Sequence, residues 1–380
     1  GAGNGIDPID IINLYSADIL RFTLALTTPF GTDVKISTKT FELGQTFCTK
    51  FWNAIRFCLL NVSMETSIDF NSYRDKLDGI DRWIFNKFNK LLVDVERSYT
   101  SYDFSEGTTK IQTFIWNDFC NTYLEMIKPR IFNADTKDFT SKVLVTILEG
   151  LTRLLHPTIP FITEEIWQKL KQIIPAYHNT KSIMETSWVK KFELNSYSEA
   201  EDVSFQILTD IIGKIRNIKK EFHVQMKEYM LDITVIGLGE HLKYIDTNKI
   251  PIKQMTKYDN LNLIKSCEKQ ENCLEYDLPN NILLYVKPSI YMDIQAKVDI
   301  IQNRKNKTIE KLRKEMSSFV KCDNEKKKGK IELKCTSLST ELMQYTNDLH
   351  FFQMMIHNAK STNNMKNTNS TDNINNTSEH

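Results

Sequence analysis

The chain has 380 residues, 41% of them hydrophobic, and a formal net charge of +1. This length and apolar content are enough to bury a large core, whereas the near-zero charge excludes nucleic-acid binding through overall charge alone. The seven cysteines are an odd number, are scattered and contain no Cys-x-x-Cys pair, a pattern typical of reduced thiols in a reducing compartment.

The first half of the chain is predicted to be a bundle of amphipathic helices. Asp7 can cap free backbone amides and Pro8 suits the first helical position, so a helix is expected over residues 8–26, with a break near Ser16. Residues 27–31 interrupt the helical pattern. Apolar residues then recur on one side of five segments, which are residues 40–61, 79–98, 104–128, 138–155 and 160–173.

The sequence pattern changes after one more helix, predicted over residues 201–222. Leu231, Ile233 and Val235 alternate with polar residues, as in a half-buried strand. Further short strands are expected at residues 261–264 and 282–286. We therefore predict a small α/β unit over residues 201–288.

The remainder of the chain is predicted to form a coiled-coil hairpin and a disordered tail. Six residues step alternately by four and three, as in a heptad repeat: Leu338, Leu342, Tyr345, Leu349, Phe352 and Ile356. An upstream helix from about residue 290 would pair with them, with residues 323–330, including Gly329, at the tip. Residues 361–380 hold seven Asn and seven Ser or Thr, too few apolar groups to offset the entropy cost of ordering.

One helix carries a polar stripe beside its apolar stripe. In residues 47–57, Lys50, Asn53 and Arg56 line up on one face of the predicted helix. Arg and Lys can bind phosphate, and Asn can both donate and accept at a base edge. The alternative is an ordinary solvated face. Trp52 could stack on a base, although a Trp on a bundle helix is more often part of the core.

Several blocks of sequence resemble one enzyme family in the same order. They are residues 3–8 (GNGIDP), 16–25 (SADILRFTLA), 47–57 (FCTKFWNAIRF), 114–125 (FIWNDFCNTYLE), 154–167 (LLHPTIPFITEEIW), 182–188 (SIMETSW) and 215–218 (IRNI). These blocks resemble the part of the valine–tRNA ligases, which are class I aminoacyl-tRNA synthetases, that follows the catalytic Rossmann domain and its KMSKS loop. Residues 292–296 (MDIQA) resemble the start of the family's C-terminal coiled coil.

The resemblance implies a mainly α protein with a helical-bundle anticodon-binding domain, a small α/β unit and a C-terminal coiled-coil hairpin. The expected divisions are residues 1–38 for the end of the catalytic domain and a stem-contact connector, 39–200 for the bundle, 201–288 for the α/β unit, 289–358 for a tRNA-binding arm and 359–380 for the disordered tail. The chain contains neither a HIGH-type nor a KMSKS motif and begins with Gly. We interpret it as a C-terminal portion of a synthetase that forms no aminoacyl adenylate alone.

The resemblance also implies where tRNA binds. In the family, an Asn and an Arg on the helix after the catalytic domain contact the anticodon, which favours Asn53 and Arg56, with Lys50 and Trp52 beside them. Residues 304–334 carry 12 Lys or Arg against five Asp or Glu, a local charge of +7. Phosphate contacts are therefore expected from Arg313, Lys314, Lys326, Lys327 and Lys328, and from a second basic cluster of Lys214, Arg216, Lys219 and Lys220.

The sequence contains no pattern that indicates a catalytic or metal site. The seven histidines form no triad, the Cys spacings fit no standard zinc pattern, and we expect neither a catalytic residue nor a metal site. Trp116, Trp167 and Trp188 are assigned to packing. The parent enzyme would use ATP and Mg²⁺ to attach valine to its tRNA, whereas this chain would bind no cofactor.

Three alternatives remain open at this stage. The chain could belong to an isoleucine or a leucine ligase, which share the general layout, or it could be a free-standing, non-enzymatic RNA-binding or scaffold protein. The expected partner is the tRNA of the valine isoacceptors. We expect a monomer that does not enter membranes and acts in the cytoplasm, with an organelle as the alternative compartment.

Overall fold

A computed structural model describes most of the chain, and its contacts divide the chain into two compact units. The described residues are 6–29, 31, 36–195, 198–222, 231–265, 270, 273–287, 293–320 and 325–372. The first unit contains Gly1–Thr209 and Lys243–Met255, and the second contains Asp210–Leu242 and Thr256–His380. The helix α9 (Glu199–Glu221) contributes to both units. The predicted domain limits at residues 38, 200, 288 and 358 stay predictions.

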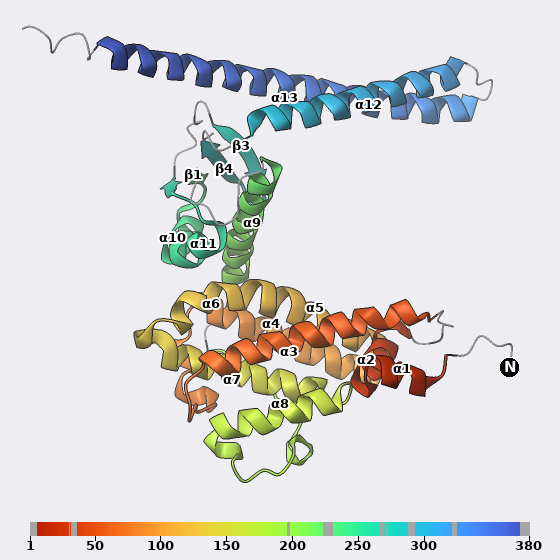
Figure 1. The fold of residues 1–380 in the computed structure, drawn as a ribbon, viewed down its shortest axis with the longest axis vertical. Coiled ribbons are helices and arrows are strands. Elements are labelled where there is room, and N and C mark those ends of the chain that lie inside the picture. The colour runs from red at the N-terminus through yellow and green to blue at the C-terminus, as the bar shows by residue number, and fades with distance from the viewer. Residues whose placement is uncertain are drawn as a thin grey trace, which may run out of the picture. The chain divides into compact units, whose positions relative to one another are not determined.

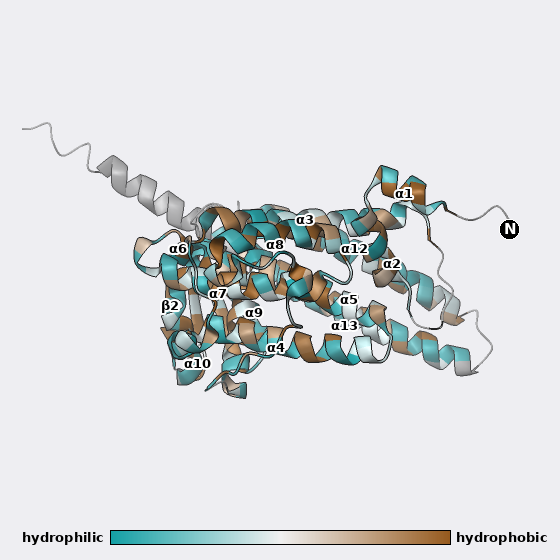
Figure 2. Cartoon of the chain, turned by 90° about the horizontal axis from the view of Figure 1, so that it is seen from below, coloured by the Kyte–Doolittle hydropathy of each residue, from teal (hydrophilic) through white to brown (hydrophobic). Residues whose placement is uncertain are grey.

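The first unit contains the helices of the predicted bundle, and the mainly α fold class is confirmed (Figure 1). Its main helices are α1 (Pro8–Leu14), α2 (Ala17–Thr27), α3 (Phe41–Asn61), α4 (Gly79–Thr100), α5 (Phe104–Thr113), α6 (Leu124–Ile131), α7 (Ala134–Leu155) and α8 (Pro160–Ile173). Short 3₁₀ turns lie at Thr38–Thr40, Phe70–Ser72, Arg74–Lys76, Pro175–Tyr177 and Ile183–Glu185. Helices such as α4 carry both hydrophobic and hydrophilic residues, as expected of amphipathic helices packed on a core (Figure 2).

Local capping explains where several helices begin. Asp7 Oδ1 accepts a hydrogen bond from Ile9 N at 2.8 Å, so α1 starts at Pro8 as predicted. Ser16 Oγ accepts from Ile19 N at 3.2 Å, which starts α2 as a separate helix after the predicted break. Asp78 Oδ1 accepts from the amides of both Ile80 and Asp81 at 2.9 Å and caps α4.

The segment predicted as one helix over residues 104–128 is three elements instead. Between α5 and α6 lies a π-helix, η4 (Phe114–Tyr123). Its wider turn is visible in Thr122, whose hydroxyl donates to the carbonyl of Asn117, five residues earlier, at 2.9 Å. π-helical turns are rare and occur often at functional sites. The apolar residues of this segment did not reveal the change, and the sequence predicted one continuous helix.

The bundle core depends on close approach between α4 and α7 at Gly150. A Cβ added to Gly150 would lie 2.7 Å from a carbon of the fully buried Phe88 ring. We predict that Gly150→Ala lowers the free energy of unfolding by ~1–3 kcal/mol, because the ring has no space to move away. Urea unfolding would measure this change. Gly213→Ala in α9 is the matched control, because nothing lies within 4 Å of its added Cβ. Equal stability of both variants would refute the close-packing argument.

The second unit contains the predicted α/β element. Its sheet has the strand order β2-β1-β4-β3, formed by β1 (Asp232–Ile236), β2 (Asn260–Ile264), β3 (Leu274–Leu278) and β4 (Ile282–Lys287). β1 pairs parallel with β2 and antiparallel with β4. The sequence pattern identified β1, β2 and β4 but missed β3, a five-residue strand in which exposed Glu275 and Asp277 alternate with apolar residues. The helices α10 (Gly239–Thr247) and α11 (Lys249–Thr256), most of whose residues belong to the first unit, were not predicted either.

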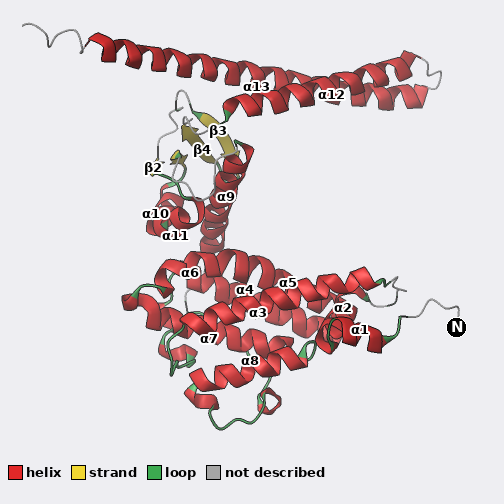
Figure 3. Ribbon diagram, in the orientation of Figure 1, coloured by secondary structure: helices red, strands yellow, loops and turns green. Residues whose placement is uncertain are grey.

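The hairpin is formed by α12 (Ile294–Val320) and α13 (Glu325–Asp372), which pack along each other (Figure 3). Leu349 and Phe352 of the predicted heptad are buried, as are Val298 and Ile301 of the opposite helix. Gly329 was wrongly placed in the turn, since it lies inside α13. The tail also differs from the prediction, because α13 continues to Asp372, in keeping with the low cost of extending an existing helix. Residues 373–380 of that tail lie outside the described residues.

Within the described part of the chain, no helix combines the length and apolarity needed to cross a membrane.

Candidate nucleic-acid interface

The outward face of α3 presents unengaged polar side chains. Phe47, Phe51 and Cys58 of its inner face are buried in the bundle. On the outer face Asn53 and Arg56 are exposed, and neither makes a side-chain hydrogen bond or ion pair with the described residues. Both groups are therefore available to a ligand. Trp52, between the two faces, is half-buried.

Lys50 is held in place, unlike Asn53 and Arg56. Its Nζ donates to Asn121 Oδ1 at 2.9 Å and lies 3.7 Å from the centre of the Trp116 ring. Asn121 and Trp116 both belong to the π-helix η4. Trp116 was assigned to packing, and the structure leaves it half-buried with its face under the ammonium group. Sequence spacing could not show this contact, since it joins helices about 70 residues apart.

Two recesses border the outer face of α3. A polar recess of about 460 Å³ is lined by Gln45, Thr46, Thr49, Lys50 and Asn53. A smaller recess of about 140 Å³ is mostly apolar and is lined by Trp52, Ile55, Arg56, Leu59, Leu60 and Lys169. Arg56 and Lys169 place positive charge at the rim of the apolar recess, and an Nζ of Lys169 also pairs with Glu165 at 2.8 Å. Aromatic and apolar surface beside cations is suited to unstacked bases.

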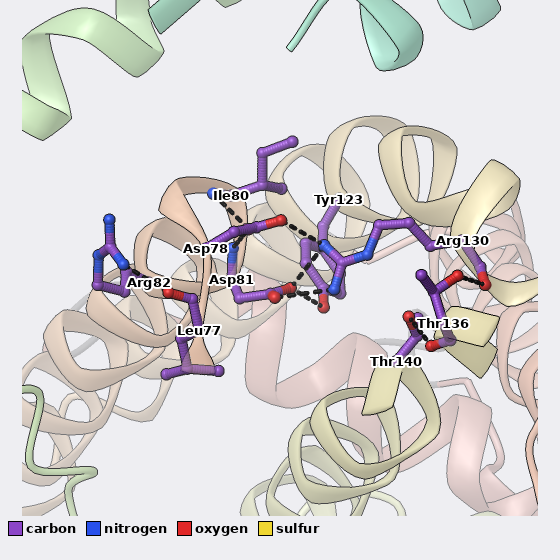
Figure 4. A network of polar contacts seen from close by, with 9 residues as sticks. All are labelled: Leu77, Asp78, Ile80, Asp81, Arg82, Tyr123, Arg130, Thr136 and Thr140. Atoms are coloured by element: carbon purple, nitrogen blue, oxygen red, sulfur yellow. Dashed lines mark hydrogen bonds and ion pairs between the residues drawn. The ribbon is translucent and has the colours of Figure 1, made fainter. Parts of the chain in front are cut away.

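A buried ion-pair network fixes the end of η4 (Figure 4). Arg130 of α6 donates from Nη2 to Asp81 Oδ2 at 2.8 Å and from Nη1 to Asp78 Oδ2 at 2.9 Å. Tyr123, the last residue of η4, donates its hydroxyl to Asp81 Oδ1 at 3.0 Å. Burial and the neighbouring Asp78 raise the pKa of Asp81 to about 6, whereas Arg130 and Tyr123 oppose this shift. The network ties α4, η4 and α6 together at one point.

The predicted basic cluster on α9 is not a uniform surface. Lys219 is fully buried and its Nζ donates to the carbonyl of Lys257 at 3.0 Å, so its assignment as a phosphate contact is wrong. The four-residue step from Ile215 places Lys219 on the apolar face of the helix, which the charge run concealed. Lys214 lies over the Tyr276 ring at 4.1 Å, Lys220 is exposed and Arg216 is half-buried.

The basic residues of the hairpin are mostly accessible. Arg313, Lys314 and Lys327 are exposed, and Lys328 is half-buried. The side chain of Lys326 lies outside the described residues. Within this arm Lys334 Nζ pairs with Glu315 at 3.2 Å, which joins α13 to α12.

A larger cavity in the first unit is lined mainly by apolar and aromatic side chains. It has a volume of about 1100 Å³, and its lining includes Leu24, Tyr102 and Phe104. The guanidinium of Arg21, at its edge, donates to the carbonyls of Pro157 at 2.7 Å and Thr158 at 3.2 Å. This arginine therefore supports the loop before α8. Among the described residues no group of three His, Cys, Asp or Glu side chains is arranged to hold a metal ion.

Comparison with known proteins gives the family. Residues 81–235 match the family described as the anticodon-binding domain of tRNA ligase. A valine–tRNA ligase of Petrotoga mobilis is 29% identical over 84% of this chain and 35% of its own length. A valine–tRNA ligase of Anoxybacillus flavithermus is 36% identical over 66% of this chain and 28% of its own length. This chain belongs to the valine–tRNA ligase family.

The family assignment agrees with the resemblance found in the sequence. It favours valine over isoleucine or leucine, because the relatives from Petrotoga, Anoxybacillus and Thermotoga maritima are all valine–tRNA ligases. The chain corresponds to the C-terminal, anticodon-binding portion of such a ligase, and it spans about a third of the length of these curated relatives. A leucine–tRNA ligase of Agrobacterium radiobacter, solved in a ternary complex with tRNA, covers 62% of this chain and 24% of its own at 15% identity, and its TM-score of 0.38 is too low to support an argument.

Proposed function

We propose that this chain binds the valine tRNA and presents it for aminoacylation, with the outer face of α3 contacting the anticodon loop. The observation that carries the proposal is the pair of exposed side chains Asn53 and Arg56, which have no partner within the described residues and lie one helical turn apart. An amide can read a base edge, and a guanidinium can bind a phosphate or a base. Trp52 supplies an aromatic surface for stacking beside them.

The hairpin of α12 and α13 would supply a second, sequence-independent contact. Its exposed cations are suited to the phosphates of a folded tRNA, and such contacts add affinity that decreases with salt. Holding the tRNA in a fixed orientation reduces the entropy cost of the reaction. We assign the attachment of valine, with ATP and Mg²⁺, to the remaining length of the relatives, and expect this chain alone to form no aminoacyl adenylate. We also propose a monomer that acts in the cytoplasm, where the free thiols of Cys48, Cys58 and Cys120 would stay reduced.

The test is a polarisation titration of the purified chain against valine, isoleucine and leucine tRNA transcripts at one salt concentration. Tighter binding of the valine transcript, by tenfold or more as an order of magnitude, is expected if base contacts contribute roughly 1–3 kcal/mol. A valine transcript whose anticodon is replaced by that of the leucine tRNA should bind like the leucine transcript. Equal binding of all transcripts would overturn anticodon recognition.

A variant of the arm separates charge from recognition. We predict that replacing Arg313, Lys314, Lys327 and Lys328 by Gln reduces the slope of log K against log salt by up to about 3.6, since each phosphate contact contributes roughly 0.9. Preference for the valine transcript should not change. A control with Gln at Lys181, Lys190 and Lys191, in the loop after α8, should keep the wild-type slope. A wild-type slope in the arm variant would exclude the arm from the interface.

A further inference from the structure

The π-helix η4 lies against the part of α3 that carries the proposed RNA contacts. Trp116 and Asn121 project from η4 toward Lys50 of α3, at the distances of 3.7 Å and 2.9 Å given above. Both side chains contact the same ammonium group, so they come from one face of the element. Asn117, between them in sequence, and Asn121 are exposed, and Trp116 is half-buried.

Buried residues of η4 fix its position on the bundle. Tyr123 at its end is fully buried and donates to Asp81, which also accepts from Arg130. Phe119, in the middle of η4, is fully buried too. The element that carries Trp116 and Asn121 is therefore anchored in the core.

The two contacts fix a side chain that would otherwise be flexible. A free lysine loses much rotamer entropy when it binds a phosphate. In this chain the rotamer entropy of Lys50 is already lost when the protein folds, because its ammonium group is held between an aromatic face and an amide oxygen. One donated hydrogen goes to Asn121, which leaves other N–H groups of the ammonium for a ligand. Both partners are neutral, so the positive charge of Lys50 is not cancelled.

We propose that η4 is the second wall of the RNA-binding surface and that Trp116 and Asn121 position Lys50 for a phosphate of the bound RNA loop. This inference rests on the proposed function, since the ligand is the same tRNA. Lys50 lines the polar recess together with Asn53 and Thr49. A loop whose base reaches Asn53 would thus bring its backbone beside Lys50. Trp116 and Asn121 are positioning residues, and Lys50 is the one that contacts RNA.

The first set of variants tests the aromatic face. With the valine tRNA transcript as ligand, Lys50→Ala should weaken binding and reduce the salt slope by about 0.7, the contribution of one phosphate contact in a single strand. Trp116→Leu should weaken binding by roughly threefold with an unchanged slope, because the charge remains but is no longer held. Trp116→Phe should restore most of the affinity, since it retains an aromatic face. Thermal unfolding checks that each variant is folded.

Variants of Asn121 separate positioning from charge without disturbing the core. Asn121→Ala should weaken binding about twofold to fivefold with the slope unchanged. Asn121→Asp should hold Lys50 more firmly but neutralise it, so both affinity and slope should decrease as in Lys50→Ala. If Asn121 had only a structural role, Asn121→Ala and Asn121→Asp would show the same salt dependence.

The outcomes distinguish this inference from the proposed function. Wild-type affinity in both Trp116→Leu and Asn121→Ala, or an unchanged slope in Lys50→Ala, overturns the role of η4 while tRNA selection by Asn53 and Arg56 still stands. Equal binding of all transcripts by the wild-type chain overturns the proposed function itself. If Trp116→Leu does not fold, Trp116→Phe and the two exposed Asn121 variants still decide the question.

Discussion

Replacing Arg130 by Met should lower the free energy of unfolding by ~3–5 kcal/mol at neutral pH, because it leaves a buried carboxylate without its cation. Asp81 is completely buried, and its partner Arg130 is only 18% exposed. Met retains much of the apolar volume of the arginine stem, so the loss reports the missing charge more than a cavity. Urea unfolding followed by circular dichroism would measure it.

The size of this loss should depend on pH. The pKa of Asp81 is about 6 in the folded protein and 3.8 for the free group, so the folded state binds the proton more tightly. Its contribution to stability is therefore largest below about pH 4 and decreases as the pH rises through about 6. Without Arg130 this pKa should rise further. The difference between Arg130→Met and wild type should thus be small near pH 5 and largest near pH 8.

A double variant provides the control. Asp81→Asn combined with Arg130→Met removes both charges and should be more stable at neutral pH than Arg130→Met alone. The double variant should also lose the extra dependence on pH between about 5 and 8. If Arg130→Met were equally destabilised at both pH values, the uncompensated charge of Asp81 would not be the cause.

Hydrophobic periodicity and helix signals were enough to predict most of the fold. The predicted limits of α4 and α8 agree with the structure to within two residues, because Asp78 caps the first and Pro160 starts the second. What the sequence did not reveal depends on tertiary contacts. The strand β3 is short and carries charged residues, and it forms by pairing with β4. The π-helix carries Phe119 and Tyr123, whose side chains are fully buried in the bundle, and this packing is not visible in local sequence.

The candidate site was predicted less completely than the fold. Periodicity correctly placed Asn53 and Arg56 on the outer face of α3, because the buried positions Phe47, Phe51 and Cys58 fix the orientation of this helix. The same reasoning failed for Lys219, where a run of charged residues suggested a surface and the four-residue spacing indicated the core. It also missed Asn121, since no local pattern joins two separate helices.

The double variant Asn53→Ala, Arg56→Ala should abolish the preference of the chain for the valine tRNA. Both side chains are exposed and unpartnered within the described residues, so their removal leaves no buried group unsatisfied and should change stability by less than about 0.5 kcal/mol. Losing a base contact and a guanidinium contact should together weaken valine tRNA binding by roughly 2–4 kcal/mol, which is about 30-fold to 1,000-fold. Polarisation titrations against the three transcripts would measure the loss of affinity for the valine tRNA and the loss of preference for it.

The control is Asn61→Ala with Lys142→Ala, which removes one amide and one cation from α3 and α7 at positions that line neither recess. Asn61 Nδ2 donates to the carbonyl of Phe57 at 2.7 Å, so thermal unfolding of this control is measured as well. It should retain the preference for the valine transcript. The single variants Asn53→Ala and Arg56→Ala should affect selectivity and salt dependence differently. Asn53→Ala alone should reduce selectivity with little change in salt slope, because an amide releases no counterion, whereas Arg56→Ala should reduce the slope by about 0.7 as well. A double variant that still selects the valine transcript would mean that another surface reads the anticodon. The arm could not account for such selection, since phosphate contacts carry no base sequence.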